Sequence, residues 1–273
     1  MHSLENVCVL VTGAGRGIGK RLAIGFAQRG ARVGLLARSK AELDLTQLEI
    51  DHSGGTAIRL RADVRHLFEV QSAVDRMRAH FGAVEVVIGA AGIQGPIGPF
   101  LENDGDDWWE TLEINLRGAV NTCRAVLPQM VQRRQGKIIL LSGGGGTRPR
   151  ANFSAYATSK AGILRFAETL ADEVRDHNVQ VNCMSPGGTY THMTDEILRA
   201  GERAGWKDTE DALQVRVTGG VTPERQLHLA MFLASDRSNH VSGKLIHVED
   251  DWKRLEGAAV NPEMFTLRRV VKG

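Results

Sequence analysis

The stretch VLVTGAGRGIGKRLAIGFAQRG, residues 9–30, connects an apolar run to a segment of helical periodicity through a glycine-rich turn. The turn contains Gly13, Gly17 and Gly19. Glycines in such a turn let the backbone approach a pyrophosphate, which would lie where the free N–H groups of the helix point outward. The triplet is weak evidence by itself and much stronger directly after the first strand of a strand–helix–strand unit. The stretch therefore predicts a strand, a turn and a helix that bind a nucleotide.

The alternation of strand and helix continues along the chain. Apolar and β-branched runs predict strands at VCVLV, ARVGLLA, TAIRLRA, VEVVIGA, KIILLS, VQVNCMS and KLIHV. Helical periodicity between them predicts helices near residues 17–29, 39–52, 66–80, 106–134, 153–176 and 223–234. Repeated units of this kind form parallel strands with right-handed crossovers and helices on both faces of the sheet. Because no solenoid repeat and no Pro/Ser-rich linker divides residues 1–273, we expect a single, doubly wound α/β domain.

Composition and charge favour small-molecule chemistry. Of the 273 residues, 42% are hydrophobic and 24% charged, so the chain can bury a large core. The formal charge of +2, from 34 basic and 32 acidic residues, provides no field that would grip a nucleic-acid backbone or an anionic membrane. No apolar run approaches the roughly 18–20 residues of a membrane helix, and MHSLENVCVLVTG lacks the features of a signal peptide. We therefore expect neither nucleic-acid nor membrane partners.

The cysteines indicate a reducing compartment and no metal site. Cys8, Cys123 and Cys183 each lie in an apolar stretch, and none belongs to a CxxC pair. Cysteines in this context are usually reduced core thiols. We expect a cytoplasmic protein without a bound metal.

Two segments interrupt the alternation. Residues 188–222 are polar and partly helical, and they lie between a strand and the next helix, where such sheets place loops that cover the substrate. We expect them to form a substrate lid. The tail, residues 250–273, contains apolar and basic residues, so we expect it to dock on its own domain or on a neighbouring subunit.

Tyr156 and Lys160 are one helical turn apart in the sequence YATSK, so both project from one face of the helix expected near 153–176. A free phenol has a pKa of about 10, and a neighbouring ammonium group favours the phenolate and lowers this value. Tyr156 could then serve as the general acid when a carbonyl is reduced, or as the general base when an alcohol is oxidised.

Together, these motifs resemble those of the short-chain dehydrogenase/reductase family, in its compact single-domain form. Thr12 to Gly19 resembles the TGxxxGxG cofactor motif and Tyr156 to Lys160 the YxxxK catalytic motif. Asn115 in INLRG, Asp63-Val64 after the third strand and Ser185-Pro186-Gly187 after the sixth also match. The resemblance runs from about Val7 to Val248 in the family's order and spacing, and it implies a Rossmann-type oxidoreductase.

The resemblance also implies roles for individual residues. Asn115 would hold a water that resupplies protons to Lys160, Lys160 would bind the nicotinamide ribose, and Asp63 would accept a hydrogen bond from the adenine. The Thr191 hydroxyl would lie near the nicotinamide carboxamide. The cofactor contacts implied are Gly13, Arg16, Gly17, Ile18, Gly19, Arg38, Asp63, Val64, Ala90, Gly92, Tyr156, Lys160, Pro186, Gly187 and Thr191. Relatives usually have NNAG where this chain has Gly89-Ala90-Ala91-Gly92, so we expect somewhat looser cofactor binding.

The end of the second expected strand indicates which dinucleotide is bound. An NAD site usually has an acidic residue there for the ribose 2′-hydroxyl, whereas a 2′-phosphate needs a cation. Ala37 stands where an NAD-preferring relative would have Asp, and Arg38 follows it. Arg16, inside the glycine turn, can reach the same phosphate. The two cationic side chains, together with the lack of an acidic residue at the end of this strand, predict that the cofactor is NADP(H).

The glycine-rich stretch LLSGGGGTRPRANFSAYATSK, residues 140–160, leaves one catalytic group open. Most relatives have a Ser 13 positions before the Tyr, where it binds the substrate oxygen; here that position is Gly143, and Ser142 is one residue earlier. Either Ser142 takes the role, or a substitute such as Thr147 or a backbone N–H does. We favour Ser142, because glycines allow backbone excursions that could realign the end of a strand.

The function expected is that of an NADP(H)-dependent ketoreductase or alcohol dehydrogenase acting on a small-molecule carbonyl or alcohol. A dehydratase or isomerase on the same fold and a cofactor-sensing binding protein are the alternatives. The resemblance further implies a homo-oligomer, either a tetramer or a dimer.

Overall fold

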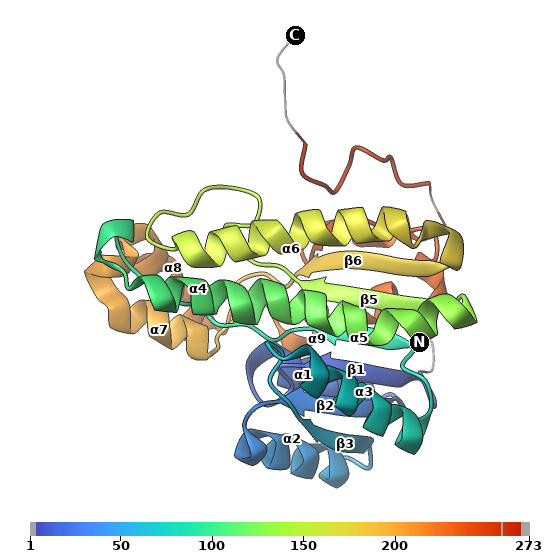
Figure 1. Cartoon of the computed structure of the whole chain (residues 1–273). Helices are drawn as coiled ribbons and strands as arrows, with labels where there is room; N and C mark the ends of the chain where they lie inside the picture. Colours follow the sequence, from blue (N-terminus) through green and yellow to red (C-terminus); the bar gives the residue numbers. More distant parts are fainter. Residues whose placement is uncertain (1–3, 258, 269–273) are drawn as a thin grey trace.

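The computed structural model describes residues 4–257 and 259–268, and its strands form one parallel sheet (Figure 1). The sheet has seven strands in the order β3-β2-β1-β4-β5-β6-β7. The strands are β1 Cys8–Thr12, β2 Arg32–Ala37, β3 Thr56–Arg61, β4 Val86–Gly89, β5 Gly136–Leu141, β6 Val179–Ser185 and β7 Leu245–His247. The chain crosses between β3 and β4 from one half of the sheet to the other, which brings β1 and β4 side by side. Ligands of doubly wound folds bind beyond the strand ends at such a switch point.

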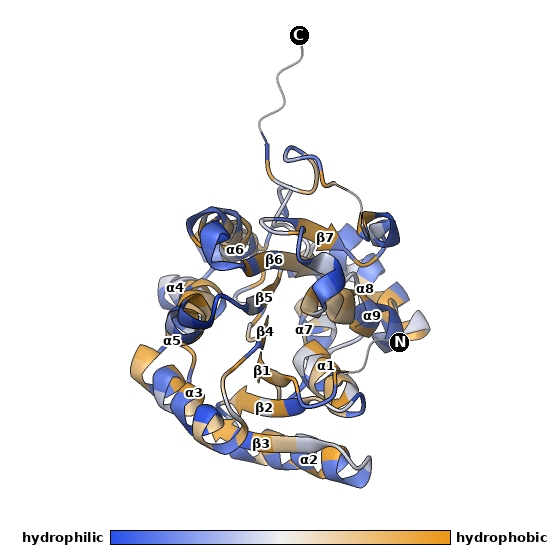
Figure 2. Ribbon diagram, turned by 90° about the vertical axis from the view of Figure 1, so that its right-hand side faces the viewer, coloured by the Kyte–Doolittle hydropathy of each residue, from blue (hydrophilic) through white to orange (hydrophobic). Residues whose placement is uncertain are grey.

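Helices cover both faces of the sheet (Figure 2). One face carries α3, α4, α5 and α6, and the other carries α1 and α9, with α7 and α8 beyond them. The helices are α1 Gly17–Ala27, α2 Lys40–His52, α3 Leu67–Phe81, α4 Gly105–Leu112, α5 Gly118–Arg133, α6 Ser154–Glu173, α7 His192–Ala200, α8 Trp206–Thr218 and α9 Pro223–Ala234. The predicted doubly wound α/β fold is thus confirmed.

Strand β1 shows why the sequence folds in this way. Its side chains alternate between the faces: Val9 and Val11 enter the hydrophobic cluster beneath α1 and α9, while Cys8 and Leu10 enter the cluster beneath α3, α5 and α6. All four are buried. Full burial of an aliphatic side chain contributes about 1.5–3 kcal/mol. A strand with four consecutive buried apolar positions therefore stabilises both layers.

The helix expected over 106–134 is interrupted by a π-helical turn. Asp104 caps α4 by accepting hydrogen bonds from the N–H groups of Asp106 and Asp107. After α4, residues Glu113–Arg117 form one turn of π-helix before α5 begins. A π-turn inserts one extra residue and changes which side chains face inward. Here the turn contains a buried polar side chain, Asn115.

The segment expected to form a lid consists of α7, a short 3₁₀ turn at Gly201–Ala204 and α8. Its two ends are joined at the base by a β-bridge between Thr189 and Gly220. Arg21 of α1 ties this base to the domain by donating to the Thr189 hydroxyl (2.9 Å) and to the Tyr190 carbonyl (2.8 Å). The segment is therefore anchored at its base while its helices project over the strand ends.

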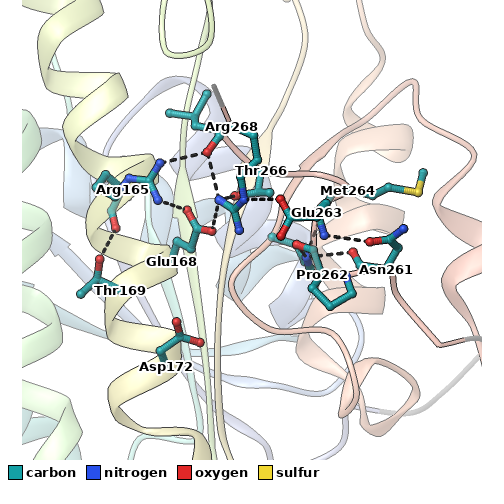
Figure 3. A network of polar contacts seen from close by, with 12 residues as sticks. Arg165, Glu168, Thr169, Asp172, Asn261, Pro262, Glu263, Met264, Thr266 and Arg268 are labelled. Atoms are coloured by element: carbon teal, nitrogen blue, oxygen red, sulfur yellow. Dashed lines mark hydrogen bonds and ion pairs between the residues drawn. The ribbon is translucent and has the colours of Figure 1, made fainter. Parts of the chain in front are cut away.

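Residues 261–268 of the tail lie against α6 and the start of β7 of their own chain (Figure 3). The buried Lys244 ammonium donates to three tail carbonyls, those of Asn261 (3.2 Å), Pro262 (2.7 Å) and Met264 (3.0 Å). The Leu245 N–H donates to the Phe265 carbonyl at 2.7 Å. Ion pairs join Arg268 of the tail to Glu168 of α6 and to Glu263. Position 258 and the last five positions of the predicted tail lie outside the described residues.

Candidate active site

A cavity of about 1310 Å³ lies at the carboxyl ends of the strands. It is bordered by the turns that follow β1, β2, β4, β5 and β6 and by the segment of α7 and α8. Pockets for drug-sized ligands measure roughly 300–1,000 Å³. This cavity is therefore large enough for a dinucleotide together with a small substrate.

The glycine turn forms the floor of one end of the cavity. Gly13 and Gly17 adopt φ angles of 68° and 58°, in the left-handed region that glycine enters at no steric cost. A Cβ atom on Gly13 would lie 2.8 Å from the Ala91 backbone, and one on Gly19 would lie 2.3 Å from the Gly13 carbonyl. No side chain caps α1, so the N–H groups of its first turn face the cavity near Ile18. The turn has the shape and the donors that a pyrophosphate needs.

Next to this turn the structure places both predicted cations and an acid that the sequence analysis missed. The Arg16 guanidinium lies 3.9 Å from the Glu42 carboxylate, and a Cβ on Gly15 would lie 2.9 Å from a Glu42 oxygen. Glu42 belongs to the first turn of α2, and its N–H donates to the N-cap hydroxyl of Ser39. The spacing Ser39-x-x-Glu42 is that of a capping box and could have identified this carboxylate. The expected absence of an acid is therefore corrected.

Asp63 is engaged by two arginines. Arg65 donates from Nε and Nη2 to its carboxylate at 2.8–3.2 Å, and Arg38 lies 3.8 Å away. Burial acts to raise the pKa of Asp63, but Arg65, helped by Arg38, outweighs it and holds the pKa below its usual value. Val64 lines the cavity, while the Asp63 carboxylate faces Arg65. The adenine contact of Asp63 stays a prediction.

The alanines after β4 pack closely under the glycine turn. The Ala91 N–H donates to the Thr12 hydroxyl at 3.2 Å, which joins β1 to the loop after β4. A Cβ on Gly19 would lie 3.3 Å from the Ala90 methyl group. Thr12 thus braces β1 against the loop after β4.

Tyr156 and Lys160 project from α6 into the middle of the cavity, as their spacing predicted. Both are buried, and the Lys160 Nζ lies 5.5 Å from the centre of the Tyr156 ring. Nζ donates to the Leu141 carbonyl at the end of β5 at 3.0 Å. Burial lowers the pKa of Lys160 from 10.5 to about 8, only partly offset by the neighbouring Cys183. The two side chains therefore share one desolvated site.

The pKa of Tyr156 differs from the expectation. Burial raises it above its usual value, and the charge that opposes this rise is Arg150 rather than Lys160. The Arg150 guanidinium lies 5.8 Å from the centre of the Tyr156 ring and 3.7 Å from that of Phe153. It is itself paired with Asp208 of α8 at 2.8 Å. Sequence spacing could not reveal Arg150 as this charge, because its loop folds back over the helix.

Asn115 connects the loop after β4 to the helix of Tyr156. Its Oδ1 accepts from the Ile93 N–H at 2.8 Å, and its Nδ2 donates to the Ile93 carbonyl and to the Ser159 hydroxyl, both at 3.0 Å. A Cβ on Gly92 would lie 3.7 Å from the Lys160 Nζ. Asn115 thus fixes the backbone beside Lys160, and its role in holding a water stays a prediction.

The glycine stretch after β5 faces the Tyr156 hydroxyl through Gly143. A Cβ on Gly143 would lie only 2.4 Å from the Tyr156 Oη. The Ser142 Oγ, in contrast, lies 3.0 Å from where a Cβ on Gly146 would stand. Ser142 also lines the cavity, with its Oγ toward Gly146, and its role in binding the substrate oxygen stays a prediction.

The loop after β6 closes the other side of the cavity. Gly187 has a φ angle of 72°, and a Cβ there would lie 2.6 Å from Val221. The Pro186 carbonyl accepts a hydrogen bond from the buried Gln226 amide at 2.9 Å. The Thr191 methyl group lies 3.7 Å from a Cβ built on Gly17, so the start of α7 faces the glycine turn. Pro186, Gly187 and Thr191 are thus brought to the cavity together.

Two features are absent from the part of the chain that the structure describes. No helix in it is both long enough and apolar enough to cross a membrane. Its His, Cys, Asp and Glu side chains form no group of three or more that could hold a metal ion.

Comparison with known proteins agrees with this site. The family model for short chain dehydrogenases matches residues 7–201. Oxidoreductase UcpA of Salmonella typhimurium is 33% identical over 246 residues, covering 89% of this chain and 93% of that protein. The solved structure of an actinorhodin polyketide ketoreductase with NADPH has a TM-score of 0.82 at 27% identity, covering 89% of this chain and 95% of that one. A 3-oxoacyl-[acyl-carrier protein] reductase with bound NAD from Brucella melitensis has a TM-score of 0.76 at 30% identity, covering 90% of both chains. The chain therefore belongs to the short-chain dehydrogenase/reductase family of oxidoreductases.

Proposed function

We propose that this protein is an NADP(H)-dependent oxidoreductase that moves hydride between C4 of the nicotinamide and a carbonyl or secondary alcohol of a small molecule. The observation that carries the proposal is the position of Tyr156 and Lys160 in the same cavity as the glycine turn. When bound, the dinucleotide supplies or accepts the hydride. The protein must then supply a proton, a site for the substrate oxygen and exclusion of water.

Tyr156 supplies the proton in this proposal. During reduction its Oη donates to the oxygen that develops negative charge, and during oxidation it accepts the alcohol proton. The guanidinium of Arg150 favours the phenolate over the phenol. It opposes the effect of burial, which favours the phenol and raises the pKa of Tyr156. In the same proposal Lys160 also binds the ribose hydroxyls of the dinucleotide, as the family resemblance implies.

The direct test is turnover against a panel of ketones, sugars, β-ketoacyl thioesters and quinones, followed by the loss of NADPH absorbance. We expect at least one carbonyl class to be reduced. If the protein binds NADPH tightly but reduces none of them, the proposed redox function is wrong and a sensing or non-redox role takes its place.

Replacement of Arg38 by Ala should lower the preference for NADPH over NADH. A charge-assisted hydrogen bond contributes about 1.5–3 kcal/mol, so the ratio of the two Kd values should shift by roughly 10- to 100-fold. Glu42→Gln is the matched variant with the opposite expectation, because it removes a carboxylate that repels a 2′-phosphate beside Arg16. Fluorescence titration with both nucleotides measures the ratio. An unchanged ratio in Arg38→Ala would mean that Arg38 does not read the phosphate.

Replacement of Ser142 by Ala should leave kcat/KM within about threefold of the wild-type value, because its Oγ lies toward Gly146. A donor to the substrate oxygen would instead cost on the order of 100- to 1,000-fold. The kcat/KM of Thr147→Ala, a variant in the same loop, is measured in the same assay. A loss of that larger size in Ser142→Ala would restore Ser142 as the group that binds the substrate oxygen.

A further inference from the structure

An ion pair between Arg150 and Asp208 joins the loop before α6 to a helix of the lid segment, residues 188–222. Arg150 lies in the loop after β5, four residues before α6 begins, and Asp208 lies in the first turn of α8. The Arg150 Nε donates to the Asp208 Oδ1 at 2.8 Å, and Nη2 lies 2.8 Å from the same oxygen. Both side chains line the cavity and are largely shielded from solvent. The lid segment is therefore linked directly to the loop that leads to Tyr156.

The catalytic loop holds Arg150 beside the phenol. Its carbonyl accepts a hydrogen bond from the Phe153 N–H at 3.3 Å. A Cβ on Gly145, whose φ angle is 95°, would lie 3.3 Å from the Arg150 Cβ. The guanidinium lies over the Phe153 ring at 3.7 Å and 5.8 Å from the centre of the Tyr156 ring. A positive charge is thus held next to the general acid–base group.

Other charged groups face the cavity around Tyr156. Lys160, on the same helix, has its Nζ 5.5 Å from the ring centre and donates to the Leu141 carbonyl. The loop after β4 and the turn between α7 and α8 contribute apolar contacts. The remaining charged or titratable side chains that line this end of the cavity are Arg148, His192, Glu196, Lys207, Asp211, His247 and Asp250. Among all these groups, Arg150 is the charge that opposes the effect of burial on Tyr156, and Asp208 is the partner of Arg150.

The relative strengths of its contacts indicate that Arg150 depends on Asp208. An arginine side chain loses considerable rotamer entropy when it is fixed in one position. A cation–π contact at a partly exposed site is weaker than this loss, so the Phe153 ring alone does not hold the guanidinium. Hydrogen bonds to a carboxylate are stronger and offset the loss. The Asp208 carboxylate therefore determines whether the guanidinium stays beside Tyr156 or turns to solvent.

We propose that Asp208 is a positioning residue, which acts on Tyr156 by holding the Arg150 guanidinium beside the phenol. Helix α8 of the lid segment thereby supplies part of the charge environment of the group that transfers the proton. The phenolate is favoured while Asp208 and Arg150 are paired, and it loses this support when the pair is broken. The inference rests on the proposed function, because it requires Tyr156 to exchange a proton with the substrate.

The test is a titration of Tyr156. The chain has only two tyrosines, and Tyr190→Phe leaves Tyr156 as the single one. In that background the ultraviolet absorbance of tyrosinate is recorded after rapid pH jumps, before the protein unfolds. Arg150→Met should raise the midpoint of ionisation by about one pH unit. Asp208→Ala should raise it as well, because the freed guanidinium turns away from the ring.

The sign of the change in Asp208→Ala separates positioning from simple charge. If Asp208 acted only as a nearby negative charge, its removal would favour the phenolate and lower the midpoint. Asp211→Ala is the matched control, because Asp211 lies on the same helix and lines the same cavity. It should not raise the midpoint. The double variant of Arg150→Met and Asp208→Ala should match Arg150→Met alone, since both changes remove the same contact.

An unchanged or lower midpoint in Asp208→Ala would overturn the inference, and so would an equal rise in Asp211→Ala. The titration needs no turnover, so it gives its answer even if the substrate panel shows that the proposed function is wrong. With any substrate that is reduced, the alkaline limb of the kcat/KM profile should move to higher pH in Asp208→Ala, because reduction requires the phenol.

Discussion

Replacement of Tyr156 by Phe is expected to lower kcat/KM for carbonyl reduction by about 1,000-fold or more. The change removes only the phenol oxygen, and general acid–base groups contribute roughly 100- to 10,000-fold. Tyr156 projects from the middle of the cavity floor, and Gly143 beside it offers no side chain that could replace the hydroxyl. Nucleotide binding should persist, because the glycine turn is untouched.

The measurement compares initial rates and NADPH titrations for wild type and Tyr156→Phe with the best substrate of the panel. A Kd that is unchanged while turnover is lost separates proton transfer from binding. Turnover that survives the substitution at more than about a tenth of the wild-type rate would contradict the proposed mechanism, since another group would then have to move the proton.

Replacement of Lys160 by Met is expected to reduce kcat/KM by roughly 100-fold or more and, at the same time, to raise the stability of the ligand-free protein. The ammonium is buried with the Leu141 carbonyl as its acceptor, and burial lowers its pKa from 10.5 to about 8. A charge held in this way costs free energy of folding on the order of 1–3 kcal/mol.

The stability difference should depend on pH in one direction. Below about pH 8, Lys160 is charged in the folded and unfolded states, and the full penalty applies. Between about pH 8 and 10.5 the folded state has lost a proton that the unfolded state still holds, so wild-type stability rises with pH. The advantage of Lys160→Met should therefore narrow over this interval.

Denaturant unfolding of both proteins at about pH 7 and pH 9.5 measures this change. The comparison cancels the contribution of Lys137, another buried lysine whose pKa is lowered to about 8. A difference that is constant with pH would mean that the Lys160 ammonium does not pay a desolvation penalty in the ligand-free protein.

Much of this fold could be predicted from the sequence, because strand periodicity and glycine placement are local signals. The run VCVLV and the turn after it indicated the first strand and the nucleotide end. The four-residue spacing of Tyr156 and Lys160 placed both side chains on one helical face. The π-turn at Glu113–Arg117 was missed, because periodicity over a long helix averages out a single inserted residue.

The finer features of the site depend on contacts between distant segments, which no local pattern encodes. The spacing before Tyr156 could not predict whether Ser142 or Gly143 faces the Tyr156 hydroxyl, because the sequence does not encode the direction in which each residue points. Arg65, in the turn after β3, pairs with Asp63 and with Glu110 of α4.

The docked tail also affects how the edge strands of the sheet can pair with another chain. The outer strands of an open sheet offer unpaired backbone groups on which another chain can build. Strand β3 forms one edge of the sheet, and the exposed side chains of Arg59 and Arg61 place positive charge along it. On β7, the Leu245 N–H is already taken by the Phe265 carbonyl. One edge of the sheet thus carries charged side chains, and the other edge is hydrogen-bonded to a segment of the same chain. Both features disfavour aggregation by pairing of edge strands.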